Sequence, residues 1–359
     1  MPTNSVLCSR KTIVAFLLIP VALGVPVTPG IEEQKGAPWH LGRISSNSKV
    51  IDLENLNAIY RYPKEAGEGV DIYVSEKSLN TKHPEFITDG VSRAKNMFDV
   101  PSTDGRSGHG TLVAGVAGSN KYGVAKKANI IAARTSSLKD ILKRHKERRA
   151  AADWKGSVVN ISWGTNFYME QDKKDIENLI KEGVHIVTAA GNEKRDACVS
   201  FPGGLNARDY GSLSLINVGA TDGTDRLWEG PGQGTNTGSC VDIWAPGAEI
   251  WTTTEDLGAG NCQGTSFSAP MVAGVVAVEL SRESNKGLRE NPTAMKNHIL
   301  SMGFRDAVLD GKGNKLVGAV LLGFKDIAGQ SRPARPSSPQ GAARQKEQGH
   351  SSPHHDSRG

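Results

Sequence analysis

The body of this chain lacks an excess of charge of either sign. The formal net charge is +5, but Arg10 and Lys11 contribute +2 of it. Residues 329–359 contribute another +3, from four arginines and one lysine against one glutamate and one aspartate. The rest of the chain is close to neutral, which argues against a basic surface built for nucleic acid. We therefore expect no nucleic-acid partner.

A long apolar run is also missing. Residues 13–19 are apolar, but this run is too short to span a bilayer comfortably and Pro20 interrupts it. The two basic residues named above precede the run, and Ala22-Leu23-Gly24 offers small residues for cleavage, a pattern typical of a secretory signal. We expect residues 1–24 to be a signal peptide and the mature protein to be secreted and extracellular, without membrane contact. An uncleaved anchor is the alternative.

Cysteine is scarce, with 4 residues in 359. Cys8 would leave with the signal peptide, so Cys198, Cys240 and Cys262 would remain. An odd number of cysteines in a secreted protein implies either one disulfide with a leftover thiol or no disulfide at all.

The sequence does carry alternating strand and helix patterns, and its length and 37% hydrophobic residues permit one large core or two modest ones. Continuous apolar runs predict buried strands at 70–74, 130–133, 158–161, 184–187 and 215–218. Helical patterns lie between them at 111–116, 138–154, 172–181 and 265–280. The alternation predicts an α/β fold with a mostly parallel central sheet and helices on both faces.

Composition divides the chain into segments. Residues 25–36 read as a short polar linker, and a globular domain is expected over residues 37–328. Residues 329–359 are rich in Pro, Ser and Arg without apolar periodicity, which predicts a disordered tail. The basic stretch 138–149 has Leu138, Ile141 and Leu142 at helical spacing, which favours a solvated helix face over an anion site.

Three polar motifs could carry chemistry. Gly264-Thr265-Ser266 precedes an apolar helix, where free N–H groups favour a developing oxyanion, although an ordinary helix cap would read the same way. Gly108-His109-Gly110 supplies a candidate base. Ala189-Ala190-Gly191-Asn192 supplies an amide on a loop after a strand. A serine, a base and an oxyanion donor are the parts that nucleophilic acyl transfer needs.

These motifs, Gly-Thr-Ser-x-x-x-Pro, Gly-His-Gly-Thr and Ala-Ala-Gly-Asn, resemble those of the subtilisin-like serine proteases (peptidase S8), nearest the proteinase K branch. They occur in the chain order of that family. The stretches 37–46, 122–128 and 218–222 resemble it as well, and the likeness runs from about residue 37 to 324. The resemblance implies a subtilisin-like three-layer fold and a peptidase activity.

The resemblance also implies roles for single residues. Ser266 would be the nucleophile, His109 the general base and Asn192 the oxyanion donor. The family has an aspartate at the end of the first core strand, where this chain has Glu76. Asp71 cannot replace it, because five residues along a strand is about 16 Å. The extra methylene of Glu76 would displace the carboxylate by roughly 1 Å, which can cost about a hundredfold in rate.

Two features of the family are altered. Arg134-Thr135-Ser136-Ser137 runs almost directly into the basic helix, so one wall of the substrate cleft is expected to be short. Trp163, on the opposite wall, is either a core or a cleft-lining residue. The dozen residues before the domain are too few for a propeptide domain. A propeptide would act in trans, or the chain folds without one, or it is a decayed copy.

The resemblance further favours a Cys198–Cys240 disulfide, because some relatives carry one there, and would leave Cys262 free; a Cys240–Cys262 pair is the rival. Asp222 matches a calcium-ligand position in some relatives, although calcium needs six to eight oxygens. We expect no required cofactor, and calcium at most as a structural ion.

Taken together, these observations predict a secreted, monomeric serine endopeptidase that acts on proteins or peptides through an acyl-enzyme intermediate, weakened by Glu76. The alternative is a catalytically inactive secreted binding protein on the same fold. Intact Ser266, His109 and Asn192 favour the enzyme.

Overall fold

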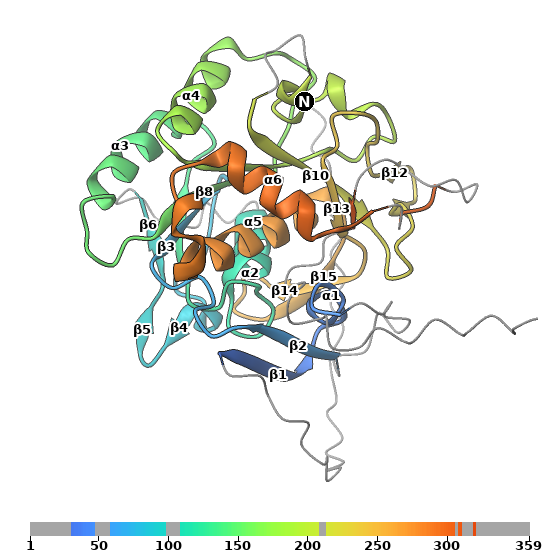
Figure 1. Ribbon diagram of the computed structural model, residues 1–359. Helices are drawn as coiled ribbons and strands as arrows, with labels where there is room; N and C mark the ends of the chain where they lie inside the picture. Colours follow the sequence, from blue (N-terminus) through green and yellow to red (C-terminus); the bar gives the residue numbers. More distant parts are fainter. Residues whose placement is uncertain are drawn as a thin grey trace, which may run out of the picture.

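A nine-stranded sheet forms the centre of the computed structural model, which describes residues 30–46, 58–97, 108–207, 213–305, 308–310 and 319–320. The strand order is β16-β17-β13-β10-β9-β8-β3-β7-β6 (Figure 1). The strands from β17 to β6 pair in parallel, and β16 alone runs antiparallel to its neighbour. The predicted signal peptide (1–24) and tail (329–359) lie outside the described residues.

All five strands predicted from apolar runs are confirmed. The strands of the sheet are β3 (Val70–Ser75), β6 (Ala94–Asn96), β7 (Asn129–Ala133), β8 (Gly156–Ile161), β9 (His185–Ala189), β10 (Leu215–Thr221), β13 (Ile243–Pro246), β16 (Phe304–Arg305) and β17 (Ala319–Val320). Their parallel arrangement explains the continuous apolar runs, because such strands are covered on both faces.

Four two-stranded antiparallel sheets surround the main sheet. They pair β1 (Ile31–Ala37) with β2 (Ala58–Pro63), β4 (Ile87–Thr88) with β5 (Val91–Ser92), β11 (Glu229–Gly230) with β12 (Gln233–Gly234), and β14 (Ile250–Thr253) with β15 (Ala259–Cys262). Strand β1 corrects the expectation of a linker over residues 25–36 for positions 31–36, and positions 25–29 lie outside the described residues. Its side chains are mostly half-buried and polar, so its order comes from backbone pairing with β2, which leaves no apolar pattern in the sequence.

The helices are α1 (Trp39–Ile44), α2 (His109–Gly118), α3 (Leu138–Arg148), α4 (Glu170–Lys181), α5 (Thr265–Ser281) and α6 (Pro292–Met302), with short 3₁₀ segments η1 (Pro84–Phe86), η2 (Ala197–Val199), η3 (Gly203–Asn206) and η5 (Glu283–Leu288). The four predicted helices are present. Helix α3 ends at Arg148 instead of extending to 154, because the chain turns there before entering β8.

Helices cover both faces of the sheet, as predicted (Figure 1). On β3, Ile72 and Val74 belong to the core cluster that holds the buried residues of α2, α5 and α6. Tyr73, between them, points to the other face and belongs to the cluster with Leu138 of α3 and Ile176 of α4. This alternation is the two-residue period of a strand, and it divides the core into two layers.

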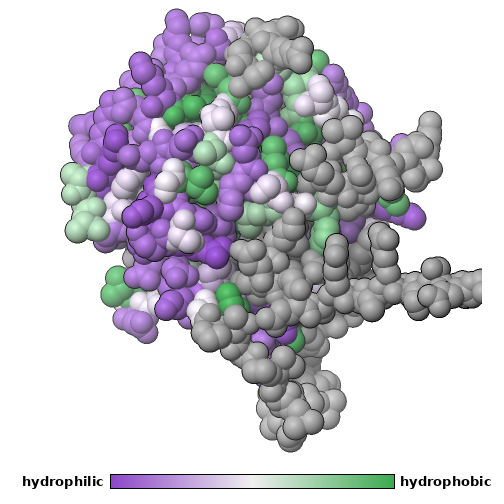
Figure 2. Space-filling view, in the orientation of Figure 1, coloured by the Kyte–Doolittle hydropathy of each residue, from purple (hydrophilic) through white to green (hydrophobic). Residues whose placement is uncertain are grey.

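The outer faces of the helices are solvated. Leu138 and Ile141 of α3 are buried while its lysines are exposed, which confirms the solvated face predicted for the basic stretch. The region over α3 and α4 is predominantly hydrophilic in Figure 2. No described helix is both long and apolar enough to cross a bilayer.

Candidate active site

The candidate residues gather where the strands of the sheet end. Glu76 follows β3 directly, and Asn192 is three residues past the end of β9. His109 is the first residue of α2, and Ser266 is the second residue of α5. Helices α2 and α5 pack against one another on the same face of the sheet. Ligand sites of open α/β sheets collect at this edge.

Glu76 and His109 form an ion pair with a geometry suited to orienting a base. Oε2 of Glu76 lies 3.0 Å from Nδ1 of His109, and the two side chains are 7% and 14% exposed. The backbone N–H of Glu76 donates to the carbonyl of Ala133 at 2.8 Å, so β7 holds the residue in place. The other oxygen, Oε1, is buried and accepts no hydrogen bond from the part of the chain that the structure describes.

Gly110 permits this pair to form. A Cβ at that position would lie 1.9 Å from the carbonyl oxygen of Ser78 and 2.9 Å from Cβ of Glu76. No side chain fits there without moving the backbone of the 76–78 loop. The glycine after His109 therefore lets the first turn of α2 approach the carboxylate closely.

The ion pair also sets the charge of His109. Burial is the largest single influence and lowers the pKa of the imidazole, but the Glu76 carboxylate raises it through its charge and its hydrogen bond. The net effect raises the pKa of His109 above its ordinary value of 6.5. His109 therefore reaches its neutral, proton-accepting form at a higher pH than an ordinary imidazole does.

Ser266 contacts the residue that follows β8, and its neighbour Phe267 contacts His109. Its Oγ donates to the carbonyl of Ser162 at 3.2 Å, and the Ser162 hydroxyl donates back to the Ser266 carbonyl at 2.9 Å. The ring of the next residue, Phe267, meets the His109 ring edge-on, with centroids 5.9 Å apart. Gly264, which precedes the helix, has φ +122°, a conformation that favours glycine. The structure thus brings the predicted nucleophile and base to one place.

Asn192 is fixed by the residue before the nucleophile. Its Oδ1 accepts hydrogen bonds from the backbone N–H of Thr265 at 3.0 Å and from the Thr265 hydroxyl at 2.8 Å. An amide whose oxygen is held on one side presents its NH₂ group on the other. The Thr265 hydroxyl also accepts from the N–H of Gly191 at 3.2 Å, which ties the Asn192 loop to the start of α5.

The sequence model of the subtilase family, peptidase S8, matches residues 67–318, which contain all four of these residues. This chain is a subtilase. It is 34% identical over 300 residues to "Subtilisin-like protease 2" of Arthroderma otae, covering 78% of this chain and 64% of that protein. It is 32% identical over 326 residues to "Subtilisin-like protease 3" of Saccharomyces cerevisiae, covering 81% and 64%. Fungal relatives of this kind fit the proteinase K branch.

A solved structure gives the same fold. A "cold adapted subtilisin-like serine proteinase" superposes with a TM-score of 0.63 at 31% identity and covers 80% of this chain and 98% of that one. The subtilase described here spans 64% of the length of the two curated relatives named above.

The sequence left Trp163 as either a core or a cleft-lining residue. In the structure of this subtilase it packs against the core layer under α3 and α4. Its indole N–H donates to the hydroxyl of Ser75 at 3.2 Å, and Ser75 directly precedes Glu76. Asp71, at the opposite end of β3, pairs with Arg148 at 3.0 Å and is therefore engaged away from the site. Trp163 thus supports the strand end that carries Glu76.

The expected Cys198–Cys240 disulfide is present and joins residues 42 positions apart. The prediction that Cys262 is free was wrong, because Cys262 is disulfide-bonded too and the described part of the chain has no free cysteine.

Asp222 acts as the cap of a turn. Its Oδ1 accepts from the backbone N–H and hydroxyl of Thr224, both at 2.8 Å, and from the N–H of Arg226 at 3.0 Å. Among the residues described, no three His, Cys, Asp or Glu side chains gather in a way that could hold a metal ion. Because calcium also binds backbone carbonyls and water, Asp222 as a calcium ligand and calcium as a structural ion stay predictions.

Sequence reasoning missed the supporting residues. Thr265 lies within a motif already noted, and Ser162 directly follows the predicted strand 158–161, but their contacts with Asn192 and Ser266 connect segments 73 and 104 residues apart. Only the spacing to the nucleophile could have drawn attention to Thr265, which immediately precedes it.

Proposed function

We propose that this subtilase is a secreted serine endopeptidase that hydrolyses peptide bonds through an acyl-enzyme intermediate on Ser266. The observation that carries the proposal is the pairing of Glu76 with His109 at 3.0 Å, with the His109 ring in contact with Phe267, the residue after Ser266. Glutamate here reaches the distance that an orienting carboxylate needs. Family membership supports the peptidase class.

In the first half of the reaction, neutral His109 takes the proton of the Ser266 hydroxyl while Oγ attacks the peptide carbonyl carbon. The carbonyl oxygen becomes an oxyanion that accepts hydrogen bonds from the Asn192 NH₂ group and from N–H groups at the start of α5. Glu76 stabilises the imidazolium by its charge. Oε1 of Glu76 accepts no hydrogen bond from the described residues, so Oε2 carries the interaction with the imidazolium.

In the second half, the imidazolium of His109 gives its proton to the leaving amine as the C–N bond breaks, and the ester on Ser266 remains. A water molecule then attacks that ester, with His109 accepting its proton, and the acid product leaves as Ser266 regains its hydrogen. The Ser266 hydroxyl must rotate from the Ser162 carbonyl toward His109 for this sequence to begin.

Labelling with a fluorophosphonate tests the proposal. The full chain, secreted from a eukaryotic host, is expected to form a stable adduct on Ser266, found by mass spectrometry, and Ser266→Ala is expected to form none. Correctly folded protein that takes no label would contradict the proposal. Amino-terminal sequencing of the protein from the medium tests secretion and the expected cleavage near residue 24.

The second candidate is a secreted binding protein without activity. One observation favours it: the Ser266 hydroxyl donates to the Ser162 carbonyl in this structure. This hydrogen bond could hold the serine away from the base. Ser162→Gly would keep it, because the acceptor is the backbone carbonyl of residue 162, and labelling would then not be restored. Absence of labelling in both wild type and Glu76→Asp, with the fold intact by circular dichroism, would support this candidate.

A further inference from the structure

Asn236 is a fully buried asparagine whose hydrogen bonds go to the loop that carries Asn192. It follows the hairpin β11–β12 and is 0% exposed. Its backbone N–H donates to the carbonyl of Gly191 at 2.9 Å. A buried amide destabilises a protein unless hydrogen bonds satisfy it, so the partners of this side chain indicate its role. The proposed reaction does not use Asn236 directly.

The oxygen of this side chain accepts two hydrogen bonds from the loop. The backbone N–H groups of Glu193 and Arg195 donate to Oδ1 of Asn236 at 3.0 and 3.1 Å. Both residues follow the oxyanion donor closely in the chain. The single acceptor therefore fixes the backbone after Asn192 at two points.

The nitrogen of the same side chain donates to the loop as well. Nδ2 donates to the carbonyl of Ala190 at 2.9 Å and to Oε2 of Glu193 at 2.8 Å. A third contact, with the hydroxyl of Ser200, is longer at 3.2 Å. Both polar atoms of Asn236 are thus satisfied, and one side chain connects residues that lie before and after Asn192.

Glu193 connects Asn236 to the oxyanion donor itself. Its Oε2, which Asn236 contacts, also accepts from the backbone N–H of Asn192 at 3.0 Å. The carbonyl of Asn192 accepts from the N–H of Gly234 at 3.0 Å. Because Thr265 holds the side-chain oxygen, both the backbone and the side chain of Asn192 are fixed.

Gly191 makes room for this arrangement. Its φ is +102°, and a Cβ there would lie 2.4 Å from Nδ2 of Asn236 and 2.7 Å from Oε2 of Glu193. A larger residue would separate these two side chains from the loop. The contacts of Asn236 therefore require the glycine that precedes Asn192.

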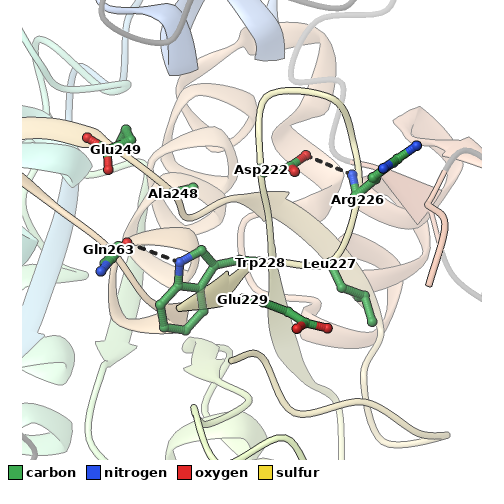
Figure 3. Close-up of a pocket in the computed structure, with 8 residues that line it drawn as sticks. All are labelled: Asp222, Arg226, Leu227, Trp228, Glu229, Ala248, Glu249 and Gln263. Carbon is green, nitrogen blue, oxygen red and sulfur yellow. Dashed lines mark hydrogen bonds between the residues drawn. The ribbon is translucent and has the colours of Figure 1, made fainter. Parts of the chain in front are cut away.

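The segment that carries Asn236 is joined to the chain that enters α5. The backbone N–H of Thr235 donates to the carbonyl of Trp228 at 3.0 Å. The buried indole N–H of Trp228 donates in turn to Oε1 of Gln263 at 3.3 Å (Figure 3). Gln263 closely precedes Ser266 in the chain. These bonds set the position of Asn236 relative to the nucleophile.

We propose that Asn236 is the positioning residue of the oxyanion site, which sets the place of the Asn192 amide relative to Ser266 without touching the substrate. The inference rests on the proposed peptidase function. An oxyanion donor is most effective when it is fixed before charge develops, because no reorganisation is then needed during the reaction. One buried side chain on a separate segment supplies that fixation.

Steady-state kinetics of two matched variants test this inference. Asn236→Ala is expected to lower kcat for a cleaved peptide about a hundredfold, the scale of a displacement of roughly 1 Å, and to change KM little. Asn217→Ala is the control, because Asn217 is also fully buried and bonds through its side chain to Thr188 at 3.1 Å and to the Cys240 carbonyl at 2.9 Å. It is expected to lower stability without lowering kcat. An equal loss of kcat in both variants would overturn the inference.

A double-mutant cycle shows whether Asn236 acts through Asn192. Asn192→Ala removes the oxyanion donor. Adding Asn236→Ala should then lower kcat only about twofold further, because the group to be positioned is gone. The full loss in both backgrounds would show a general structural role and overturn the inference.

Asn236→Asp covers the case in which alanine prevents folding. The aspartate keeps an acceptor for the two N–H groups but sets a carboxylate against that of Glu193. We expect kcat to fall here too. Adding Glu193→Gln returns a donor to this contact and should recover roughly tenfold. An unchanged kcat after this addition would contradict the proposed positioning.

Hydrogen exchange separates failure of this inference from failure of the proposed function. Deuterium uptake by peptides covering residues 190–195 is followed by mass spectrometry in the wild type, Asn236→Ala and Asn217→Ala. Faster uptake in Asn236→Ala alone, without cleavage by the wild type, contradicts the peptidase but supports the positioning of the loop. Cleavage by the wild type with an unchanged kcat in Asn236→Ala overturns the inference and leaves the peptidase intact. Equal uptake in all three proteins without cleavage overturns both.

Discussion

Oε2 of Glu76 lies 3.0 Å from Nδ1 of His109, although the family has the shorter aspartate at this position. Two contacts fix the backbone around this pair. The Glu76 N–H is held by the Ala133 carbonyl, and Gly110 sets the distance between α2 and the 76–78 loop. Glu76 is thus accommodated, and the expectation that it must weaken the site is open to test.

Glu76→Asp is expected to lower kcat/KM about a hundredfold, because the shorter side chain withdraws the carboxylate by roughly 1 Å from a base placed for glutamate. Glu76→Gln should cost more, on the order of 10⁴, the loss seen when the orienting carboxylate of other serine proteases is replaced. Hydrolysis of one peptide by the three proteins measures both. A gain for Glu76→Asp would show instead that the site was detuned by glutamate.

The pH dependence of the reaction follows from the pKa of His109, which Glu76 raises above 6.5. Since the base must be neutral, kcat/KM is expected to rise with pH through a midpoint above 6.5. Glu76→Gln removes the carboxylate that raises this pKa but keeps the burial that lowers it. The midpoint of the pH profile should therefore shift downward. A pH profile of the residual activity measures the shift, and an unchanged midpoint would contradict the ion pair.

The same pair predicts how stability depends on pH. A pKa that is higher in the folded state contributes stability that is complete below about pH 6.5 and disappears as the pH rises through the folded value. The destabilisation caused by Glu76→Gln should therefore be larger at pH 5.5 than at pH 9. Urea unfolding at both values tests this, and equal differences would count against the pair.

Thr111, two residues after His109 on α2, joins this helix to the 76–80 loop. Its buried hydroxyl accepts from the Asn80 N–H at 2.8 Å and donates to Oε2 of Glu255 at 2.5 Å. Thr111→Val leaves both partners unpaired and should cost about 1–3 kcal/mol of stability. Because the loop carries Glu76, we expect kcat to fall more than KM changes. Thr111→Ser keeps the hydroxyl and should restore both.

Arg43 and Asp225 form a buried pair between α1 and the turn after β10. The guanidinium contacts both carboxylate oxygens, at 2.8 and 2.9 Å, and the side chains are 3% and 2% exposed. Arg43→Met should cost about 3–5 kcal/mol, because it removes the cation that compensates a buried carboxylate. Adding Asp225→Asn should recover part of that loss, since asparagine also tolerates the φ of +62° found there. Chemical denaturation of the single and double variants measures the coupling.

Removing the Cys198–Cys240 bond should destabilise the protein by about 4 kcal/mol, because the bond closes a loop of 42 residues in the unfolded chain. The double variant Cys198→Ala/Cys240→Ala isolates this disulfide from the one at Cys262, which a reducing agent would also break. Thermal unfolding compares the two proteins. A loss under about 1 kcal/mol would show that the loop is already constrained without the bond.

Much of this subtilase could be predicted from sequence because its signals are local. Apolar runs at 70–74 and 158–161 mark strands covered on both faces, and the helical pattern after Ser266 marks α5. The motifs around His109, Asn192 and Ser266 identify the family, and parallel strands bring the ends of such segments to one edge of a sheet. These features depend on neighbours in the chain.

Tertiary structure decided the rest. Strand β1 has no apolar pattern and exists through pairing with β2, so its sequence reads as a linker. The distance between Glu76 and His109 depends on how closely α2 approaches the end of β3, and the anchoring of Asn192 by Thr265 spans 73 residues. Asn236 reaches Glu193 and Ala190 across 43 and 46 residues of the chain. Each of these features depends on distances that the packing of the whole fold determines, and the identity of the residues alone does not specify such distances.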